Sequence, residues 1–149
     1  MINLNCDLNS EEKDLLRECM DSWDTMEYEA KNQLSPKLKN IVNRPIETAF
    51  EILDKNNITR LQISFSGGND DGGSDGCCVY VGESDNPVNI DLNNCDIASI
   101  LEKPIYDKYY GFGFNGDVTG ICIWEIKKRE IYLRGTEQTY NSVTENIEL

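Results

Sequence analysis

The sequence predicts an α+β fold, in which N-terminal helices pack on one face of an antiparallel sheet of about five strands. Apolar residues recur at three- and four-residue spacing early in the chain, whereas short alternating segments bounded by turn residues dominate its later part. Helices followed by strands indicate an α+β fold. The 149 residues suit a single domain, 1–149, with a helical segment at 1–44 and an α+β core at 45–149.

The first predicted helix runs from Ser10 to about Gln33. Asn9 or Ser10 can cap its N-terminus, and acidic residues follow in the first turn, where the helix dipole favours them. Trp23 belongs to the apolar stripe and is expected to be packed rather than to anchor a partner. The stripe consists of Leu15, Leu16, Cys19, Met20, Trp23 and Met26.

Two shorter apolar segments precede the first strand. Pro36 suits a first helical position, and a short turn of apolar residues follows it. Pro45 then opens an amphipathic helix, which ends at Asn56 and Asn57 because asparagine tolerates left-handed geometry. The apolar face of this helix has the i, i+3, i+4, i+7 pattern, with Ile46, Ala49, Phe50 and Leu53.

The first two predicted strands enclose a glycine- and aspartate-rich segment, 64–76. Upstream, Leu61, Ile63 and Phe65 alternate with polar residues, as in a half-buried strand. Downstream, residues 77–81 are β-branched, aromatic or cysteine and indicate a second strand. The glycines between them permit sharp reversals, so the segment is predicted to be a solvated hairpin loop.

The next part of the chain is predicted to hold a third strand at 88–92 and a helix. Asp96 can cap this helix, and Lys103-Pro104 is expected to interrupt it. An aromatic cluster amid glycines follows and is expected to fold onto the sheet edge, although such rings can also form a ligand-stacking surface. The cluster comprises Tyr106, Tyr109, Tyr110, Phe112 and Phe114.

The C-terminal part is predicted to be a β-hairpin and an edge strand. Residues 118–126 and 130–134 read as the two strands, and the basic run Lys127-Lys128-Arg129 forms the turn between them. Residues 140–147 are predicted to form a last strand at the sheet edge, where charged residues discourage aggregation.

The 64–76 segment is also the candidate metal site. Asp70, Asp71 and Asp75 supply the oxygen ligands that calcium and magnesium prefer. Counted from Asp71, Gly73 and Gly82 occupy the third and twelfth positions of an EF-hand, where ligands are required, so an EF-hand is excluded. The segment also lacks the lysine and the following helix of a P-loop. An irregular cation site is the alternative to a solvated loop.

Composition excludes several function classes. The chain contains no histidine, which rules out a Ser-His-Asp or Cys-His mechanism within it. The net charge of −13 disfavours nucleic acid and anionic membranes as partners and favours a basic protein surface, although many soluble proteins are simply acidic. Residues 70–117 form an acidic block with ten acidic and two basic residues.

The cysteines and the N-terminus indicate a reducing cytoplasm. None of the six cysteines forms a Cys-x-x-Cys pair, which argues against a zinc knuckle. The N-terminus is polar and does not read as a signal peptide. Free and mostly packed thiols are therefore expected.

From Pro45 onward, the layout resembles a family of small uncharacterised bacterial and phage proteins, a domain of unknown function. An amphipathic helix and a strand lead into a Gly-Ser-Gly-Asp-Ser-Gly-type loop, here 66–73, in which Asn69-Asp70-Asp71 departs from the family pattern. A hairpin with the spacing of Gly116, Gly120 and Trp124 follows. The resemblance covers about two thirds of the chain and implies a fold but no activity.

These observations predict a non-enzymatic, cytoplasmic protein that binds and blocks a basic partner surface. A nucleic-acid-binding protein of a bacterial defence or toxin system fits as partner, so the chain would be a phage- or mobile-element-encoded inhibitor or a toxin-neutralising protein. The alternatives are a calcium- or magnesium-dependent module built on the candidate metal site, and a structural subunit of a larger assembly. The predicted contact residues are Asp70, Asp71, Asp75, Asp85, Asp91, Asp96 and Asp107.

Overall fold

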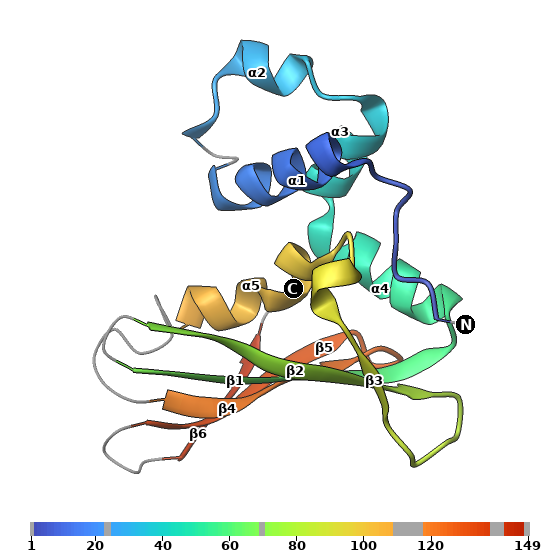
Figure 1. Cartoon of the computed structure of the whole chain (residues 1–149), viewed down its shortest axis with the longest axis vertical. Helices are drawn as coiled ribbons and strands as arrows, with labels where there is room; N and C mark the ends of the chain where they lie inside the picture. Colours follow the sequence, from blue (N-terminus) through green and yellow to red (C-terminus); the bar gives the residue numbers. More distant parts are fainter. Residues whose placement is uncertain (1, 23–24, 69–70, 109–117, 138–141, 148–149) are drawn as a thin grey trace.

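The computed structural model has helices on one side of a twisted antiparallel sheet (Figure 1). The structure describes residues 2–22, 25–68, 71–108, 118–137 and 142–147. These residues form five α-helices and a six-stranded sheet of order β3-β2-β1-β4-β5-β6, in which every neighbouring pair is antiparallel. The predicted α+β class is confirmed, and the sheet has one strand more than the five or so expected.

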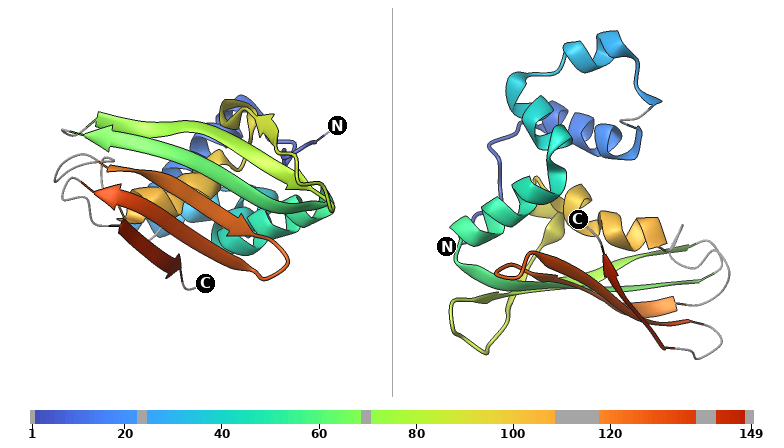
Figure 2. Two further views of the ribbon diagram at one scale, coloured as in Figure 1. Left: turned by 90° about the horizontal axis from the view of Figure 1, so that it is seen from below. Right: turned by 180° about the vertical axis from the view of Figure 1, so that it is seen from behind.

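Helices α4 (Pro45–Lys55) and α5 (Ala98–Lys108) lie directly on the sheet, over its central strands β1 (Ile58–Gly68) and β4 (Val118–Glu125). The apolar face predicted for α4 is confirmed, because Ala49, Phe50 and Leu53 are buried and Ile46 is partly buried against the core. Since α4 and α5 cover only one face, the other face of the sheet carries no helix in the described part of the chain (Figure 2).

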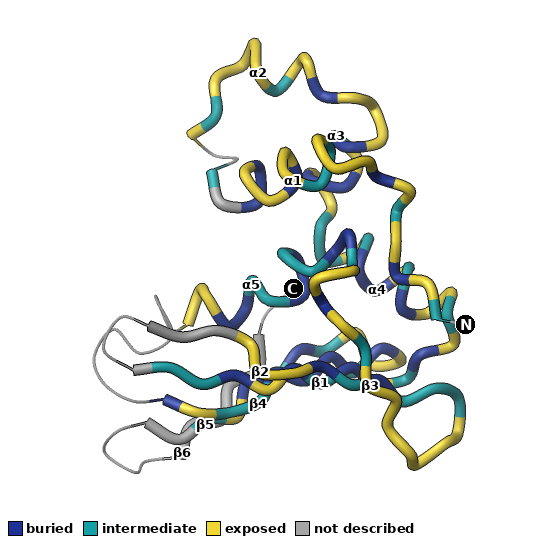
Figure 3. Tube along the Cα trace, in the orientation of Figure 1, coloured by how far each residue is buried: buried dark blue, intermediate teal, exposed yellow. Residues whose placement is uncertain are grey.

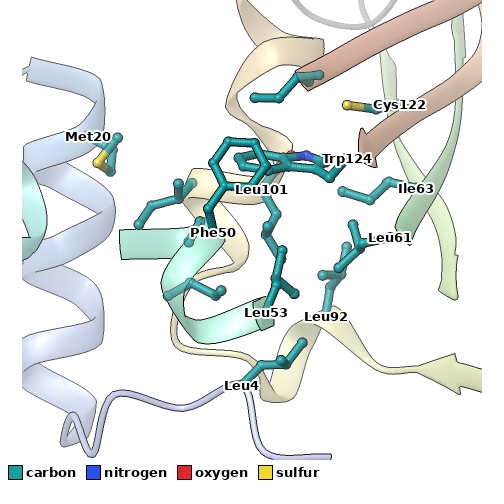
Figure 4. Close-up of a cluster of buried hydrophobic side chains, with 14 of the residues drawn as sticks. Leu4, Met20, Phe50, Leu53, Leu61, Ile63, Leu92, Leu101, Cys122 and Trp124 are labelled. Atoms are coloured by element: carbon teal, nitrogen blue, oxygen red, sulfur yellow. The ribbon is translucent and has the colours of Figure 1, made fainter. Parts of the chain in front are cut away.

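Trp124 is the centre of the hydrophobic core between sheet and helices (Figure 4). Its ring lies 5.1 Å from that of Phe50, centroid to centroid, at a tilted angle. Its indole Nε1 donates a hydrogen bond to the Leu101 carbonyl at 3.2 Å, so the polar atom of this buried ring is satisfied. The same core includes Leu16 and Leu38 from the N-terminal helical segment.

The N-terminal segment forms a second tier of helices above α4 and α5 (Figures 1 and 2). It comprises α1 (Ser10–Ser22), α2 (Tyr28–Asn32) and α3 (Pro36–Asn43). The prediction of one helix over 10–33 is therefore wrong, because the chain leaves the helix after residue 22 and forms a separate short helix. Trp23 lies outside the described residues.

Side chains cap the N-termini of α1 and α3. The Asn9 side chain accepts a hydrogen bond from the Glu12 backbone N–H at 2.9 Å, and the Glu12 carboxylate accepts one from the Asn9 N–H at 3.2 Å. This reciprocal pair is a capping box. At α3, the Ser35 hydroxyl accepts from the Leu38 N–H at 3.2 Å.

The segment predicted as a loop, 64–76, is mostly strand. Strand β1 continues to Gly68 and β2 (Asp71–Val81) begins three residues later, with Gly67 paired to Gly72 and Gly68 to Asp71. The glycines offer no propensity for a strand, but β1 gains ladder hydrogen bonds on both sides because β4 pairs with it up to Gly67. The solvated-loop prediction is therefore wrong outside the tip, which lies beyond the described residues.

The remaining helix and strands lie where the sequence predicts them, except that α5 does not stop at Pro104. Strand β3 (Val88–Ile90) and the 3₁₀ turn η2 (Leu92–Asn94) precede α5, which runs through the buried Pro104 instead of stopping there. Strand β5 (Glu130–Glu137) completes the predicted hairpin, and β6 (Ser142–Ile147) is the predicted edge strand. The aromatic cluster lies outside the described residues apart from Tyr106, which is exposed.

Candidate partner-binding surface

The aspartates predicted to bind a partner are spread over different parts of the molecule. Asp70 lies outside the described residues, and Asp71 is described only as the first backbone position of β2. The side chains of the other five are described, and the next paragraphs place them. They do not converge on one face.

Asp75 and Asp107 lie toward the same end of the sheet. The register of β1 changes from Ser64 opposite Gly76 to Phe65 opposite Ser74, so Asp75 is the extra residue of a β-bulge, and it is exposed. The last turn of α5, which carries Asp107, points to this end as well (Figure 1). Asp107 is exposed and forms an ion pair with Lys103 at 3.2 Å. Of these two carboxylates, only Asp75 has no ion-pair partner within the described ranges.

Asp85 and Asp91 lie elsewhere. Asp85 belongs to the connection between β2 and β3, at the opposite end of the sheet, where it lines a polar cavity of about 350 Å³ together with Glu83, Glu125 and Arg60. Asp91 caps η2, because its carboxylate accepts a hydrogen bond from the Asn93 N–H at 3.0 Å. Asp91 therefore has a local structural role.

Asp96 is buried, with 5% of its surface exposed, and cannot contact a partner in this conformation. One carboxylate oxygen accepts hydrogen bonds from the backbone N–H groups of Cys6 at 2.7 Å and Leu8 at 3.3 Å. The other accepts no hydrogen bond from the described residues and lies 3.0 Å from the Lys13 ammonium. Asp96 therefore fastens the N-terminal segment to the core, and its expected place on a partner surface is corrected.

The candidate metal site stays a prediction. No group of three histidine, cysteine, aspartate or glutamate side chains within the described residues is arranged to hold a metal ion. Two of the three proposed ligands, Asp70 and Asp71, have no described side chain, and only Asp75 can be placed. The described part of the site thus contributes a single exposed carboxylate.

The densest acidic stretch of the chain is a different one, residues 7–29. It contains nine acidic and two basic residues, a net charge of −7 within 23 residues, whereas the 48 residues of the 70–117 block carry −8. A charge count in short windows would have found it. Sequence reasoning passed over it because the acidic residues alternate with an obvious apolar stripe and read as the solvated face of a helix.

Helix α1 displays these acidic residues on its outer side. Glu11, Asp14 and Glu18 follow one another at three- and four-residue spacing and are all exposed, opposite the buried Leu16 and Cys19. None of the three forms an ion pair with a described residue. No lysine or arginine side chain within the described residues therefore forms an ion pair with this acidic stripe.

The two basic residues of α1 have acidic partners outside the stripe. Lys13 pairs with the buried Asp96. Arg17 is exposed and interacts electrostatically with Glu102 of α5, whose pKa is raised because burial outweighs the opposing effects of Arg17 and of a hydrogen bond with Ser74. Neither basic residue forms an ion pair with Glu11, Asp14 or Glu18 in the described part of the chain.

Exposed apolar side chains occur in the same two helices as the acidic residues. Leu15 lies among the acidic residues of α1 and is 39% exposed, and Tyr28 begins α2 and is 78% exposed. Helix α2 has no buried residue, and the exposed Glu27 and Glu29 lie at its N-terminus (Figure 3). We use the name acidic helical surface for these seven residues of the α1–α2 segment: Glu11, Asp14, Leu15, Glu18, Glu27, Tyr28 and Glu29.

The six thiols are free, as predicted, and three of them are poorly suited to nucleophilic chemistry because their pKa values are raised. Burial, with the nearby Asp96 carboxylate as the second cause, raises the pKa of Cys6 to about 11. Burial also raises the pKa of Cys95 to about 11 and that of Cys122 to about 12. Since the thiolate is the reactive form, these three cysteines are inert near neutral pH.

The comparisons with known proteins leave the function to be argued from the molecule itself. No family model, no curated protein and no solved structure matches the chain. The resemblance stated from the sequence therefore stays an expectation. No helix in the described part of the chain is long and apolar enough to cross a membrane.

Proposed function

We propose that this chain is a non-enzymatic interaction protein that binds and blocks a basic surface of another protein through its acidic helical surface. The observation that carries this proposal is the charge arrangement of α1. Its two basic residues are engaged with Asp96 and Glu102, whereas Glu11, Asp14 and Glu18 remain exposed and unpaired among the described residues.

The unpaired acidic stripe has a cost that a basic partner would remove. Like charges at three- and four-residue spacing on a helix destabilise it by a few tenths of a kcal/mol per pair. A lysine- or arginine-rich partner replaces this repulsion with attraction and is steered toward the surface before contact. Leu15 and Tyr28 supply apolar contact area beside the charges, as at the centres of protein interfaces.

The partner class that fits is a protein whose basic surface serves nucleic acid. Such surfaces carry dense lysine and arginine side chains that neutralise phosphates. An acidic helical surface placed over them competes with nucleic acid for the same side chains. An inhibitor of a bacterial defence protein, or a protein that neutralises a nucleic-acid-directed toxin, would act in this way.

The test compares two triple variants that change the net charge equally, from −13 to −10. One neutralises the stripe, E11Q/D14N/E18Q, and the other neutralises exposed aspartates at the sheet ends, D75N/D85N/D107N. A partner is captured from the native host with the wild-type chain at low salt and purified, and its affinity for each variant is measured by calorimetry. The stripe variant should bind about tenfold more weakly, from about 0.5 kcal/mol per exposed charge pair.

Two results would contradict this proposal. Equal weakening by both variants would show that only the net charge matters. An affinity that does not change between about 0.05 and 0.5 M NaCl would exclude an exposed electrostatic contact, because screening at such concentrations strongly reduces exposed charge–charge attraction. Circular dichroism of both variants checks that neither has lost the fold.

A further inference from the structure

The sheet face opposite the helices, which we call the open face, is uncovered in the described part of the chain (Figures 1 and 2). Side chains alternate between the two faces of a strand, so the residues next to core positions point to this face. Leu61, Ile63, Cys122 and Trp124 belong to the core. Gln62 of β1 and the isoleucines of β4 therefore belong to the open face.

The open face is more apolar than a solvated face requires. Antiparallel sheets with one face in water usually alternate between apolar and polar residues. In β4, however, Ile121 and Ile123 point away from the core, so the strand is apolar on both sides. Ile123 is only 4% exposed although it lies outside the main core cluster. Such a strand has the composition of one that is buried on both faces.

Neighbouring strands extend this apolar area across the sheet. Strand pairing places Ile123 between Gln62 and Tyr132, and Cys78 lies beyond Gln62. All three of these neighbours are half-buried. One row of the open face thus runs Cys78, Gln62, Ile123, Tyr132, without a charged side chain.

Few charged residues occupy the strand positions of the open face. Arg60 forms an ion pair with Glu125 at 2.6 Å, and Glu130 and Arg134 lie on β5. The pairing of Gly68 with Asp71 adds one acidic position at the start of β2. These described strand positions carry a net charge of −1 in a chain of net charge −13. Most contacts between two copies of the chain bring negative surfaces together, whereas the strands of the open face have little net charge with which to repel their own copy.

We propose that the open face binds a second copy of this chain, so that two sheets pack face to face in a symmetric dimer. The charges on β5 are arranged for such a contact. Glu130 and Arg134 lie two residues to either side of Tyr132. A two-fold axis that runs across the strands along the Ile123 row therefore places Arg134 of each copy opposite Glu130 of the other, and Ile123 opposite its own equivalent.

This packing is compatible with the proposed function but does not depend on it. Sheets pack face to face at about 10 Å with interdigitating side chains. The acidic helical surface lies on the helix side of the sheet, so a dimer would present two such surfaces pointing away from each other. Failure of partner binding would leave the dimer untouched, and the reverse holds as well.

The test is a charge-exchange experiment on the intact chain. The variants R134E and E130R each carry two like charges on β5, so each should repel its own copy. Mixed together, they carry opposite charges and should form a heterodimer. The two positions lie about 13 Å apart along one strand, too far for a direct contact within one copy, so restored association reports a contact between copies.

Sedimentation velocity and native mass spectrometry measure the outcome. The wild-type chain should dimerise at micromolar concentrations, each single variant should dissociate at least tenfold more readily, and the mixture should recover the wild-type affinity as a heterodimer. Labelling of Cys78 by a maleimide should slow as the wild-type concentration rises, but not in R134E. A wild-type monomer up to about 500 µM, a mixture that stays monomeric, or a dimer unaffected by either variant would overturn the proposal.

Discussion

At the residue scale, Asp96 shows how far local sequence signals reach. Its place before an apolar helical pattern indicates a helix cap, and its charge suggested a partner contact. In the structure its carboxylate binds backbone N–H groups of Cys6 and Leu8, about ninety positions away along the chain. No local pattern contains such a contact, because it depends on where the N-terminal segment crosses the fold.

Replacement of Asp96 by alanine should destabilise the protein by about 3 kcal/mol, because two backbone N–H groups lose a charged acceptor in a buried site. The Lys13 ammonium limits the loss, since its side chain is 42% exposed and can be hydrated. Urea unfolding measures the difference. The matched control is Asp107→Ala, which removes an exposed helical ion pair and should cost less than about 0.5 kcal/mol. Similar losses for the two variants would contradict the role given to Asp96.

At the element scale, β4 contains a glycine whose role depends on its neighbours in the sheet. Gly120 lies opposite Phe65 on β1 and opposite Gly135 on β5. A Cβ atom there would overlap the Arg134 carbonyl oxygen and would lie 2.8 Å from both the Phe65 ring and the Gly135 Cα atom. The absence of a side chain at Gly120 therefore lets the Phe65 ring and strand β5 approach β4.

Gly120→Ala should destabilise the protein by about 2 to 4 kcal/mol, because two of the three overlapping atoms belong to backbone that cannot move aside. Gly76→Ala is the matched control, since a Cβ atom there meets nothing within 4 Å. That variant should be neutral or up to about 1 kcal/mol more stable, because alanine restricts the unfolded chain. Thermal unfolding of both variants measures these effects, and equal midpoints would exclude the steric explanation.

The elements that the sequence predicted correctly are those with strong local patterns. The face of α4, the hairpin of β4 and β5, and the edge strand β6 all follow from periodicity and turn residues. The extension of β1 and β2 through the glycine-rich segment could not be predicted, because only pairing with each other and with β4 makes strands of it. Pro104 was misjudged because the packing of α5 on the core outweighs the one backbone hydrogen bond that a proline cannot donate.

At the scale of the whole molecule, the negative charge is concentrated in the N-terminal helical segment rather than on the sheet. The N-terminal stretch 7–29 carries −7 of the total −13, and Lys13 of α1 is paired with the buried Asp96. The described strand positions of the open face carry a net charge of only −1. The total charge follows directly from the sequence, and the basic partner inferred from it stays a proposal. The sequence could not predict the location, because the position of α1 above α5 is a property of the assembled fold.

This separation makes the effect of salt on stability predictable. Compact states of highly charged chains are destabilised by self-repulsion, which salt screens. From about 10 to 150 mM NaCl, the free energy of unfolding should therefore rise by about 1 kcal/mol, or about 3 °C in Tm. Calorimetry at pH 7 measures this shift.

The E11Q/D14N/E18Q variant tests where that repulsion arises. Because it removes three unpaired charges from the densest acidic stretch, its Tm should rise less with salt than that of D75N/D85N/D107N, which has the same net charge but loses charges that lie farther apart. A wild-type Tm that falls with salt would mean that ion pairs such as Arg60–Glu125 outweigh the repulsion. Equal salt responses of the two variants would mean that the repulsion follows net charge alone, so that the acidic helical surface would have no special weight in the electrostatics of the fold.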